Sequence, residues 1–156
     1  MPRLTAPVVP AGSLNAVEQP VLRAGDLLLR PWAEADADAV VTAFADPVLR
    51  RWHARSIASR EEAVELISSY HRDWRAETGA HWAITGPGFV GRVALRTVDL
   101  GEGTAEMAYW VTPAARGRGV ATRAVGVLGR WALRDLGLHR LELHHSAGTP
   151  PRAGWR

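Results

Sequence analysis

The stretch Glu106-Met-Ala-Tyr-Trp-Val-Thr-Pro-Ala-Ala-Arg-Gly-Arg-Gly-Val-Ala121 decides the fold of this 156-residue chain. Its first half has the composition of a β-strand, and its second half is a glycine-rich loop that leads into a helix. Such a loop points several backbone N–H groups at one place, where the positive end of the helix dipole adds to them. Gly117 and Gly119 leave room for a bulky anion, and Arg116 and Arg118 supply charge-assisted contacts. We therefore expect the loop to bind a diphosphate.

Two familiar phosphate-binding loops do not fit this stretch. The Walker pattern requires Gly-Lys-Ser/Thr, and the chain contains no lysine. The dinucleotide fingerprint requires a third glycine where Thr122 stands, although Glu142 lies at a suitable distance for a ribose contact. It also requires the first glycine directly after the strand, whereas residues 112–116 intervene. The nature of the cofactor must therefore come from the surrounding pattern.

The residues on either side of the loop predict a mixed sheet. Gly86-Pro87-Gly88 and Gly101-Glu102-Gly103 separate strand-like runs, which indicates tight turns and an antiparallel meander. After the loop, a helix to about Leu136, closed by Gly137, should cross over to a strand that pairs in parallel beside the meander. The expected strands are His81–Thr85, Phe89–Leu100, Thr104–Val111 and Arg140–His145.

The preceding part of the chain alternates between strand and helix. Leu27–Pro31 is a short apolar run that predicts a first strand, and the alanine-rich segment Glu34–Ala45 predicts a helix. Asp46-Pro47 should end that helix. Ser59 and Glu62 form a capping box in front of apolar residues at helical spacing, so a further helix should begin there.

Composition limits the function classes. A chain with 47% hydrophobic and 22% charged residues can form one domain of ordinary size. It has no cysteine for disulfides or an acyl-enzyme, and no apolar run approaches the roughly 20 residues of a membrane helix, so we expect a cytoplasmic protein without a membrane span. All 19 basic residues are arginines interleaved with acids, so nucleic acid is not the expected partner. No metal is expected, because the adjacent His144 and His145 face opposite sides of a strand.

The two ends of the chain differ in composition from the middle. Prolines at positions 2, 7, 10 and 20 interrupt the first segment, so residues 1–20 are expected to be a disordered leader. Pro150 and Pro151 block a strand near the other end. The expected organisation is therefore one domain over residues 21–146, followed by an irregular tail over 147–156.

The quoted stretch resembles the central signature of the GNAT superfamily of N-acetyltransferases, whose loop reads Arg/Gln-x-x-Gly-x-Gly/Ala. Arg116, Gly119 and Ala121 match this pattern. The resemblance covers roughly residues 21–146 and implies a GNAT-like α/β (α+β) fold. Four further segments resemble the ribosomal-protein-alanine (RimJ/RimL-like) branch, namely Leu28-Leu-Arg-Pro-Trp32, Asp46-Pro47, Arg51-Trp52 and Gly137-Leu-His-Arg-Leu-Glu142.

The resemblance implies acetyl-coenzyme A (acetyl-CoA) as co-substrate and a neutral amine that attacks its thioester directly. The pantetheine arm should lie between the two parallel strands, paired with the backbone of Trp110 and Val111. Glu106 is the candidate general base, acting directly or through water, and its alternative is a solvated glutamate at a strand end. Trp52 and His53 are candidates for the acceptor pocket, and a core tryptophan is the alternative at position 52. The diphosphate should bind to Arg116, Gly117, Arg118, Gly119, Val120, Ala121 and Thr122.

The resemblance also predicts an incomplete domain. Family members continue after this strand with Asn-Pro-x-Ser, another helix and further strands, and this chain ends at Arg156 without them. Leu141 and Leu143 would then lie on an exposed sheet edge, which favours a homodimer; the alternative is a chain that is weakly folded and inactive. The expected function is acetyl transfer from acetyl-CoA to a primary amine, either a protein N-terminus or a small molecule. The alternatives are a non-catalytic CoA-binding or interaction module and an arginine-rich nucleic-acid binder.

Overall fold

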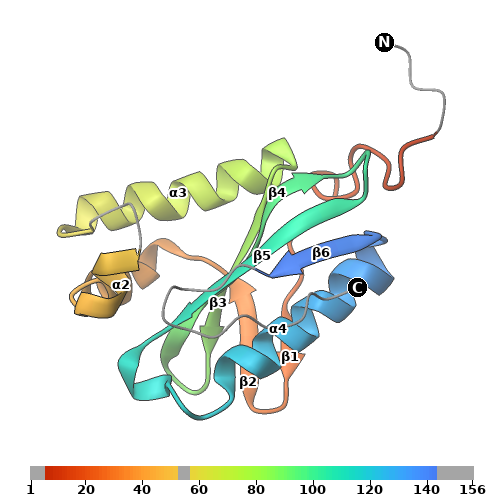
Figure 1. Cartoon of the computed structure of the whole chain (residues 1–156). Helices are drawn as coiled ribbons and strands as arrows, with labels where there is room; N and C mark the ends of the chain where they lie inside the picture. Colours follow the sequence, from red (N-terminus) through yellow and green to blue (C-terminus); the bar gives the residue numbers. More distant parts are fainter. Residues whose placement is uncertain (1–5, 53–56, 144–156) are drawn as a thin grey trace.

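The computed structural model describes residues 6–52 and 57–143 (Figure 1). Within this part of the chain, one sheet has the strand order β1-β2-β3-β4-β5-β6. Helices cover both of its faces, so the expected α/β class is confirmed. The strands are β1 (Leu22–Ala24), β2 (Leu27–Pro31), β3 (Ala80–Thr85), β4 (Phe89–Asp99), β5 (Thr104–Val111) and β6 (Arg140–Leu143). The helices are η1 (Glu34–Asp36), α1 (Ala37–Ala43), α2 (Pro47–Trp52), α3 (Arg60–Ala76), η2 (Pro113–Ala115), α4 (Val120–Arg130) and η3 (Trp131–Leu136).

The strand pairing confirms both the meander and the parallel unit. β2, β3, β4 and β5 follow one another as antiparallel neighbours. β5 and β6 are parallel, with Thr104 opposite Arg140 and Met107 opposite Leu143. The crossover between them contains α4 and the π-helical turn η3, and it ends at Gly137 with φ of 94°. The cap expected at Gly137 is therefore present. The short hairpin strand β1 was not predicted from the sequence.

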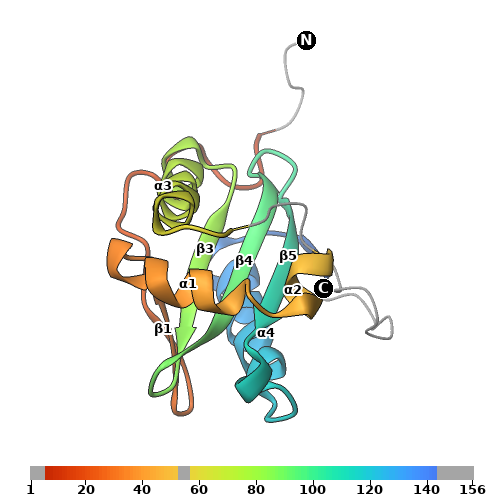
Figure 2. The ribbon, with the colours of Figure 1, turned by 90° about the vertical axis from the view of Figure 1, so that its left-hand side faces the viewer.

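Each face of the sheet has its own core. α4 packs on one face, where Trp82, Leu95, Met107 and Leu128 are fully buried. α1 and α3 pack on the other face, around Trp32 and Trp110. Figure 2 shows α1 crossing one face of the sheet while α4 lies behind it. Because successive side chains of a strand point to opposite faces, the residues of β5 divide alternately between the two cores.

The capping box at the start of α3 is confirmed in part. The Ser59 side chain accepts a hydrogen bond from the Glu62 N–H at 3.2 Å, and the apolar face of the helix buries Ala63, Ile67 and Trp74. α3 ends at a left-handed residue, Glu77, with φ of 60°.

The expected disorder of the leader is wrong for residues 6–20. Val9 and Leu14 are buried in the core on the α4 side of the sheet. The Glu77 carboxylate accepts hydrogen bonds from the N–H groups of Gly12 (2.8 Å) and Leu14 (2.8 Å), and the Trp82 indole donates to the Pro20 carbonyl at 2.7 Å. The prolines interrupt helix and strand, but they do not prevent an irregular segment from packing when its backbone finds such partners.

β6 forms one edge of the sheet in the part of the chain that the structure describes. Leu141 is buried in the core on the α4 side of the sheet, and Leu143 is half-buried. The predicted continuation of this strand to His145, the tail over 147–156 and the early end of the domain all concern residues beyond 143, outside the described ranges. No helix of the described residues is long and apolar enough to cross a membrane.

Candidate active site

The two parallel strands are paired over only part of their length. Their register begins at Thr104 and Arg140 and ends at Met107 and Leu143. β5 continues to Val111, whereas its pairing with β6 ends at Met107. Residues 108–111 therefore have no strand partner on the β6 side within the described ranges. The opposite edge of the same segment remains paired with β4. Among the described residues, backbone N–H and C=O groups on this side of β5 therefore have no strand partner, and such groups could pair with a ligand.

Trp110 and Val111, the two residues expected to pair with pantetheine, lie on this unpaired part of β5. The Trp110 side chain points into the core, where it is 2% exposed and contacts the rings of Phe44 and Phe89. Only its backbone can therefore face a ligand. Val111 is half-buried and begins the connection to the loop.

The glycine-rich loop has the conformation that its sequence predicts. Gly117 and Gly119 have φ of 78° and 73°, a left-handed backbone that favours glycine, and a Cβ at either position would meet nothing within 4 Å. α4 then begins at Val120. The Arg123 N–H donates to the Gly119 carbonyl at 3.0 Å, whereas the N–H groups of residues 117–122 have no backbone acceptor in the described structure. These N–H groups and the helix dipole make the loop suitable for an anion.

The side chains of the loop differ in what they contact. The Arg116 guanidinium donates to the carboxylate of Asp46, in the connection between α1 and α2. Arg118 is exposed and lines a pocket of about 270 Å³ together with Arg123. Val120 is buried in the core, and Ala121 and Thr122 lie in the first turn of α4. Of the seven predicted diphosphate-binding residues, Val120 can thus contribute only its backbone.

Asp46 is a site residue whose role the sequence did not reveal. Its carboxylate accepts a hydrogen bond from Arg116, and the nearby N–H groups of Val48 and Leu49 help to lower its pKa. The hydrogen bond from Arg116 is the main cause that lowers the pKa of Asp46 below its usual range. Asp46 therefore stands at the start of α2, where its backbone carbonyl accepts the Arg50 N–H at 3.1 Å, and its side chain pairs with an arginine of the loop. The Asp-Pro pair signalled a helix boundary, and nothing in the sequence connected it with Arg116, 70 residues away.

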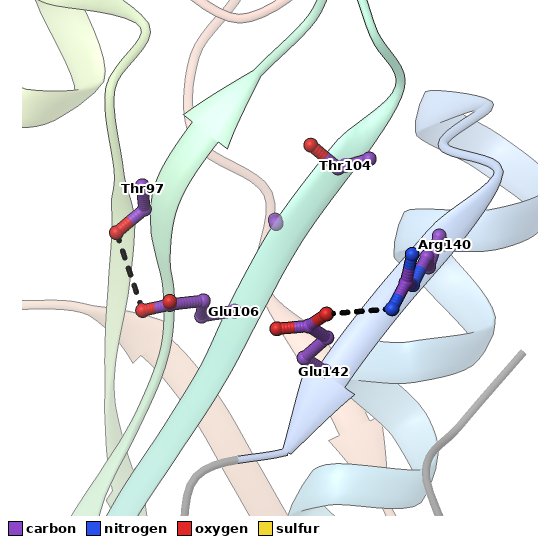
Figure 3. A pocket seen from close by; sticks show the side chains of 6 residues that line it. Thr97, Thr104, Glu106, Arg140 and Glu142 are labelled. Carbon is purple, nitrogen blue, oxygen red and sulfur yellow. Dashed lines mark hydrogen bonds and ion pairs between the residues drawn. The ribbon is translucent and has the colours of Figure 1, made fainter.

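Glu106 lies on β5 at the face opposite α4, because Ala105 and Met107 on either side belong to the α4-side core. It lines a pocket of about 270 Å³ with Thr97, Thr104, Ala105, Arg140 and Glu142 (Figure 3). The Thr97 hydroxyl donates to Glu106 Oε2 at 3.2 Å, and Arg140 donates to Glu142 Oε1 at 2.8 Å. Glu142 is opposite Glu106 in the register of the two parallel strands. Glu106 therefore occupies a solvent-accessible pocket beside the point where β5 and β6 cease to pair.

Two residues, Trp52 and His53, were proposed for the acceptor pocket. The backbone of α2 ends at Trp52, and its side chain and the whole of His53 lie outside what the structure describes. A larger cavity of about 620 Å³ lies between α1 and the β5–α4 connection, and its lining includes Thr42, Asp46 and Phe89. Asp46 is the charged residue of this lining, and it is already paired with Arg116.

A buried polar cluster lies under α3, apart from the loop. Arg92 donates to His81 Nδ1 at 2.7 Å, so His81 Nε2–H donates to Asp73 Oδ2 at 2.8 Å. Burial is the main cause that lowers the pKa of His81 to about 4, and the hydrogen bond to Asp73 only partly opposes it. His81 is therefore neutral at pH 7, and its contact with Asp73 is a hydrogen bond rather than an ion pair.

The mixed sheet, the partly paired parallel strands and the glycine-rich loop at the start of α4 define an α/β protein. Residues 26–150 match the family model described as acetyltransferase (GNAT) domain, and the chain belongs to this family of acyltransferases. The resemblance noted in the sequence is confirmed by this match.

Known proteins similar to the chain agree with this assignment. The uncharacterized N-acetyltransferase YoaA of Bacillus subtilis (strain 168) is 24% identical over 126 residues, which cover 78% of this chain and 71% of YoaA. RimJ of Mycobacterium smegmatis, solved in complex with CoA-disulfide, has a TM-score of 0.71 and 25% identity over 80% of this chain and 65% of RimJ. An acetyl transferase from Salmonella typhimurium that modifies the N-terminal serine of ribosomal protein L7/L12 has a TM-score of 0.70 and 15% identity, over 80% of this chain and 74% of that one.

Proposed function

We propose that this protein transfers the acetyl group of acetyl-CoA to a primary amine within a ternary complex. The observation that carries the proposal is the edge of β5 over residues 108–111, which has no strand partner among the described residues and continues through η2 to the glycine-rich loop. One end of this path offers backbone hydrogen bonds for an extended arm, and the other offers N–H groups for a diphosphate. Acetyl-CoA has both parts in this order.

The residues present fit this co-substrate. The N–H groups of residues 117–122 would hold the diphosphate, and the left-handed glycines leave space for it. Arg116, fixed by Asp46, and Arg118, which is exposed, would add charge-assisted hydrogen bonds. The backbone of Trp110 and Val111 would orient the pantetheine arm along β5.

When bound, acetyl-CoA supplies the thioester carbonyl that the amine attacks. Glu106 would take the proton that the amine loses, either directly or through a water in the pocket that it lines. Positioning of the two reactants on the sheet supplies a further part of the rate. A backbone N–H of the unpaired segment of β5 is available to donate to the oxyanion that develops on the carbonyl.

The acceptor we propose is a protein N-terminus, ahead of a small-molecule amine. The support is analogy, since the solved structures with the same fold include RimJ and the enzyme that modifies L7/L12. The reaction would take place in the cytoplasm, where acetyl-CoA and ribosomal proteins are found. Trp52, the last residue of α2, and His53 remain our candidates for contacts with the acceptor.

We also propose that two copies associate through β6. This strand is an edge of the sheet in the described part of the chain, and an edge strand presents unpaired backbone groups to a second strand. Sedimentation should then show a dimer that a proline at Glu142, Glu142→Pro, dissociates.

An acetylation assay tests the proposed function. Purified protein and acetyl-CoA are incubated with peptides that begin with serine or alanine and, in parallel, with polyamines, and the CoA thiol released is measured. We expect turnover with the peptides that Glu106→Gln slows strongly. Binding of acetyl-CoA without turnover on any amine would instead favour the alternative of a non-catalytic CoA-binding module.

A further inference from the structure

Thr97 has a backbone conformation that threonine rarely adopts. Its φ is +50°. In the described part of the chain, Thr97 and Glu77 are the two residues other than glycine that have a positive φ. A β-branched residue in this region is a steric outlier, because its side chain crowds the neighbouring carbonyl. Such outliers persist only where the surroundings hold them, and they gather at functional sites.

The surroundings of Thr97 do hold this conformation. Its position interrupts the ladder between β4 and β5, where the register shifts between Arg96 and Asp99. On the far side of the irregularity the Val98 N–H donates to the Thr78 carbonyl at 3.0 Å, and the Val98 side chain packs against the core. Bulges of this kind redirect a side chain, and they are frequent beside active sites.

Packing of Thr97 itself does not explain the strain. Its side chain is exposed, so it gains little from burial, and a glycine would adopt the same backbone without crowding. The conformation instead directs the Thr97 hydroxyl at the Glu106 carboxylate, as Figure 3 shows. The distance between Thr97 Oγ1 and Glu106 Oε2 is 3.2 Å, a hydrogen bond from a neutral donor to a charged acceptor.

We propose that Thr97 is a positioning residue for the reaction: the bulge in β4 presents its hydroxyl to Glu106 and restricts where the Glu106 carboxylate can lie. This inference rests on the proposed role of Glu106 as the group that takes the proton. Thr97 would not touch the acceptor or acetyl-CoA. It would reduce the number of rotamers open to a flexible glutamate, and catalysis by a general base depends on such placement.

Three substitutions separate the hydroxyl from the backbone. Thr97→Gly removes the hydroxyl and relieves the positive φ, Thr97→Val removes the hydroxyl but keeps the branched shape, and Thr97→Ser keeps the hydroxyl. We expect kcat to fall about tenfold in the glycine and valine variants, a part of the 10²- to 10⁴-fold that a general base supplies. The serine variant should stay within about twofold of the wild type. KM for acetyl-CoA should not change, because the diphosphate loop lies at the other end of β5.

A second background shows whether the effect passes through Glu106. In Glu106→Gln protein, Thr97→Gly should cause no further loss of kcat, since the carboxylate that it places is gone. A purely structural role would lower kcat by the same factor in both backgrounds, and that result would overturn the proposal. The glycine variant should unfold at the same temperature as the wild type or above it, so that misfolding cannot account for its lower kcat.

Crystal structures of the variants give a readout that does not need activity. We expect Glu106 in one rotamer in the wild type and in Thr97→Ser, and in several rotamers in Thr97→Gly. If the wild type acetylates no amine but the rotamers differ in this way, the proposed function is wrong and the placement of Glu106 by Thr97 stands. If the wild type is active and Thr97→Gly keeps both its kcat and its single rotamer, the placement is wrong and the function stands.

Discussion

The guanidinium of Arg116 donates a hydrogen bond to the carboxylate of Asp46, although 70 positions separate them in the sequence. The Asp46 carboxylate lies at the start of α2, where the N–H groups of Val48 and Leu49 help to lower its pKa. One side chain therefore joins the glycine-rich loop to the helix whose far end carries Trp52, the residue proposed to contact the acceptor.

Substitutions of Asp46 should show the capping role separately from the charge. Asp46→Ala removes the cap and should lower the free energy of unfolding by about 1–2 kcal/mol, the usual loss for an N-cap. Asp46→Asn keeps an oxygen acceptor for the helix, so it should cost under about 1 kcal/mol, the value of a partly exposed ion pair. Urea unfolding measures both, and equal losses in the two variants would show that the cap contributes nothing.

Glu77 should anchor the segment before β1. Burial alone would raise the pKa of Glu77, but hydrogen bonds from the N–H groups of Gly12, Leu14 and Asn15 together lower it. Glu77→Gln weakens these charge-assisted bonds and should cost about 1–2 kcal/mol of stability. It should also make residues 6–20 more sensitive to limited proteolysis. Glu18→Gln, at an exposed position of the same segment, is the control, and equal proteolysis of the two variants would contradict this anchoring role.

The buried His81 should make the protein less stable in mild acid. Its pKa is about 4 in the folded protein and 6.5 in the unfolded chain, so the unfolded state binds the extra proton between these values. The free energy of unfolding should therefore fall as pH drops from 6.5 towards 4, by up to about 1.4 kcal/mol for each pH unit. Urea unfolding at pH 7, 6 and 5 tests this. His81→Asn should flatten the dependence, and an unchanged slope in that variant would assign it to other groups.

Glu106→Gln should lower kcat by a factor on the order of 10² to 10³, because the amide cannot take the proton. The dissociation constant of acetyl-CoA should change little, since Glu106 is far along β5 from the loop. Glu142→Gln is a matched control, because Glu142 lines the same pocket from β6 and is paired with Arg140. Similar losses of kcat in the two variants would argue against a specific role for Glu106.

Most of the sheet could be predicted from the sequence because local signals mark its turns. The glycine-rich turns around β4 separate the strands, and the bounds of β5 agree with the prediction to the residue. The backbone conformation of the loop from Arg116 to Gly119 was likewise predictable, because closely spaced glycines in front of a helix favour a left-handed backbone. These features depend on residues close together in the chain.

The features that were missed depend on contacts between distant residues. The packing of residues 6–20 follows from Glu77 and Trp82, which lie more than 50 residues later in the chain. The pairing of Asp46 with Arg116 has the same origin. The bulge at Thr97 is a third case, because its position is fixed by Thr78 and by the partner strand β5 rather than by a local turn signal. Local patterns cannot report such pairings when each segment taken alone favours an irregular or extended chain.

The central claim, that the loop before α4 holds the diphosphate of acetyl-CoA, is tested most directly by calorimetric titration of acetyl-CoA into three proteins. These are the wild type, Gly119→Glu, and Gly126→Glu as a control. Both substitutions add the same side chain where a Cβ meets nothing within 4 Å, but only position 119 lies in the loop and has a left-handed φ. We predict binding by the wild type and by Gly126→Glu, and loss of binding by Gly119→Glu. Equal binding by all three proteins would contradict the claim and place the co-substrate elsewhere on the molecule.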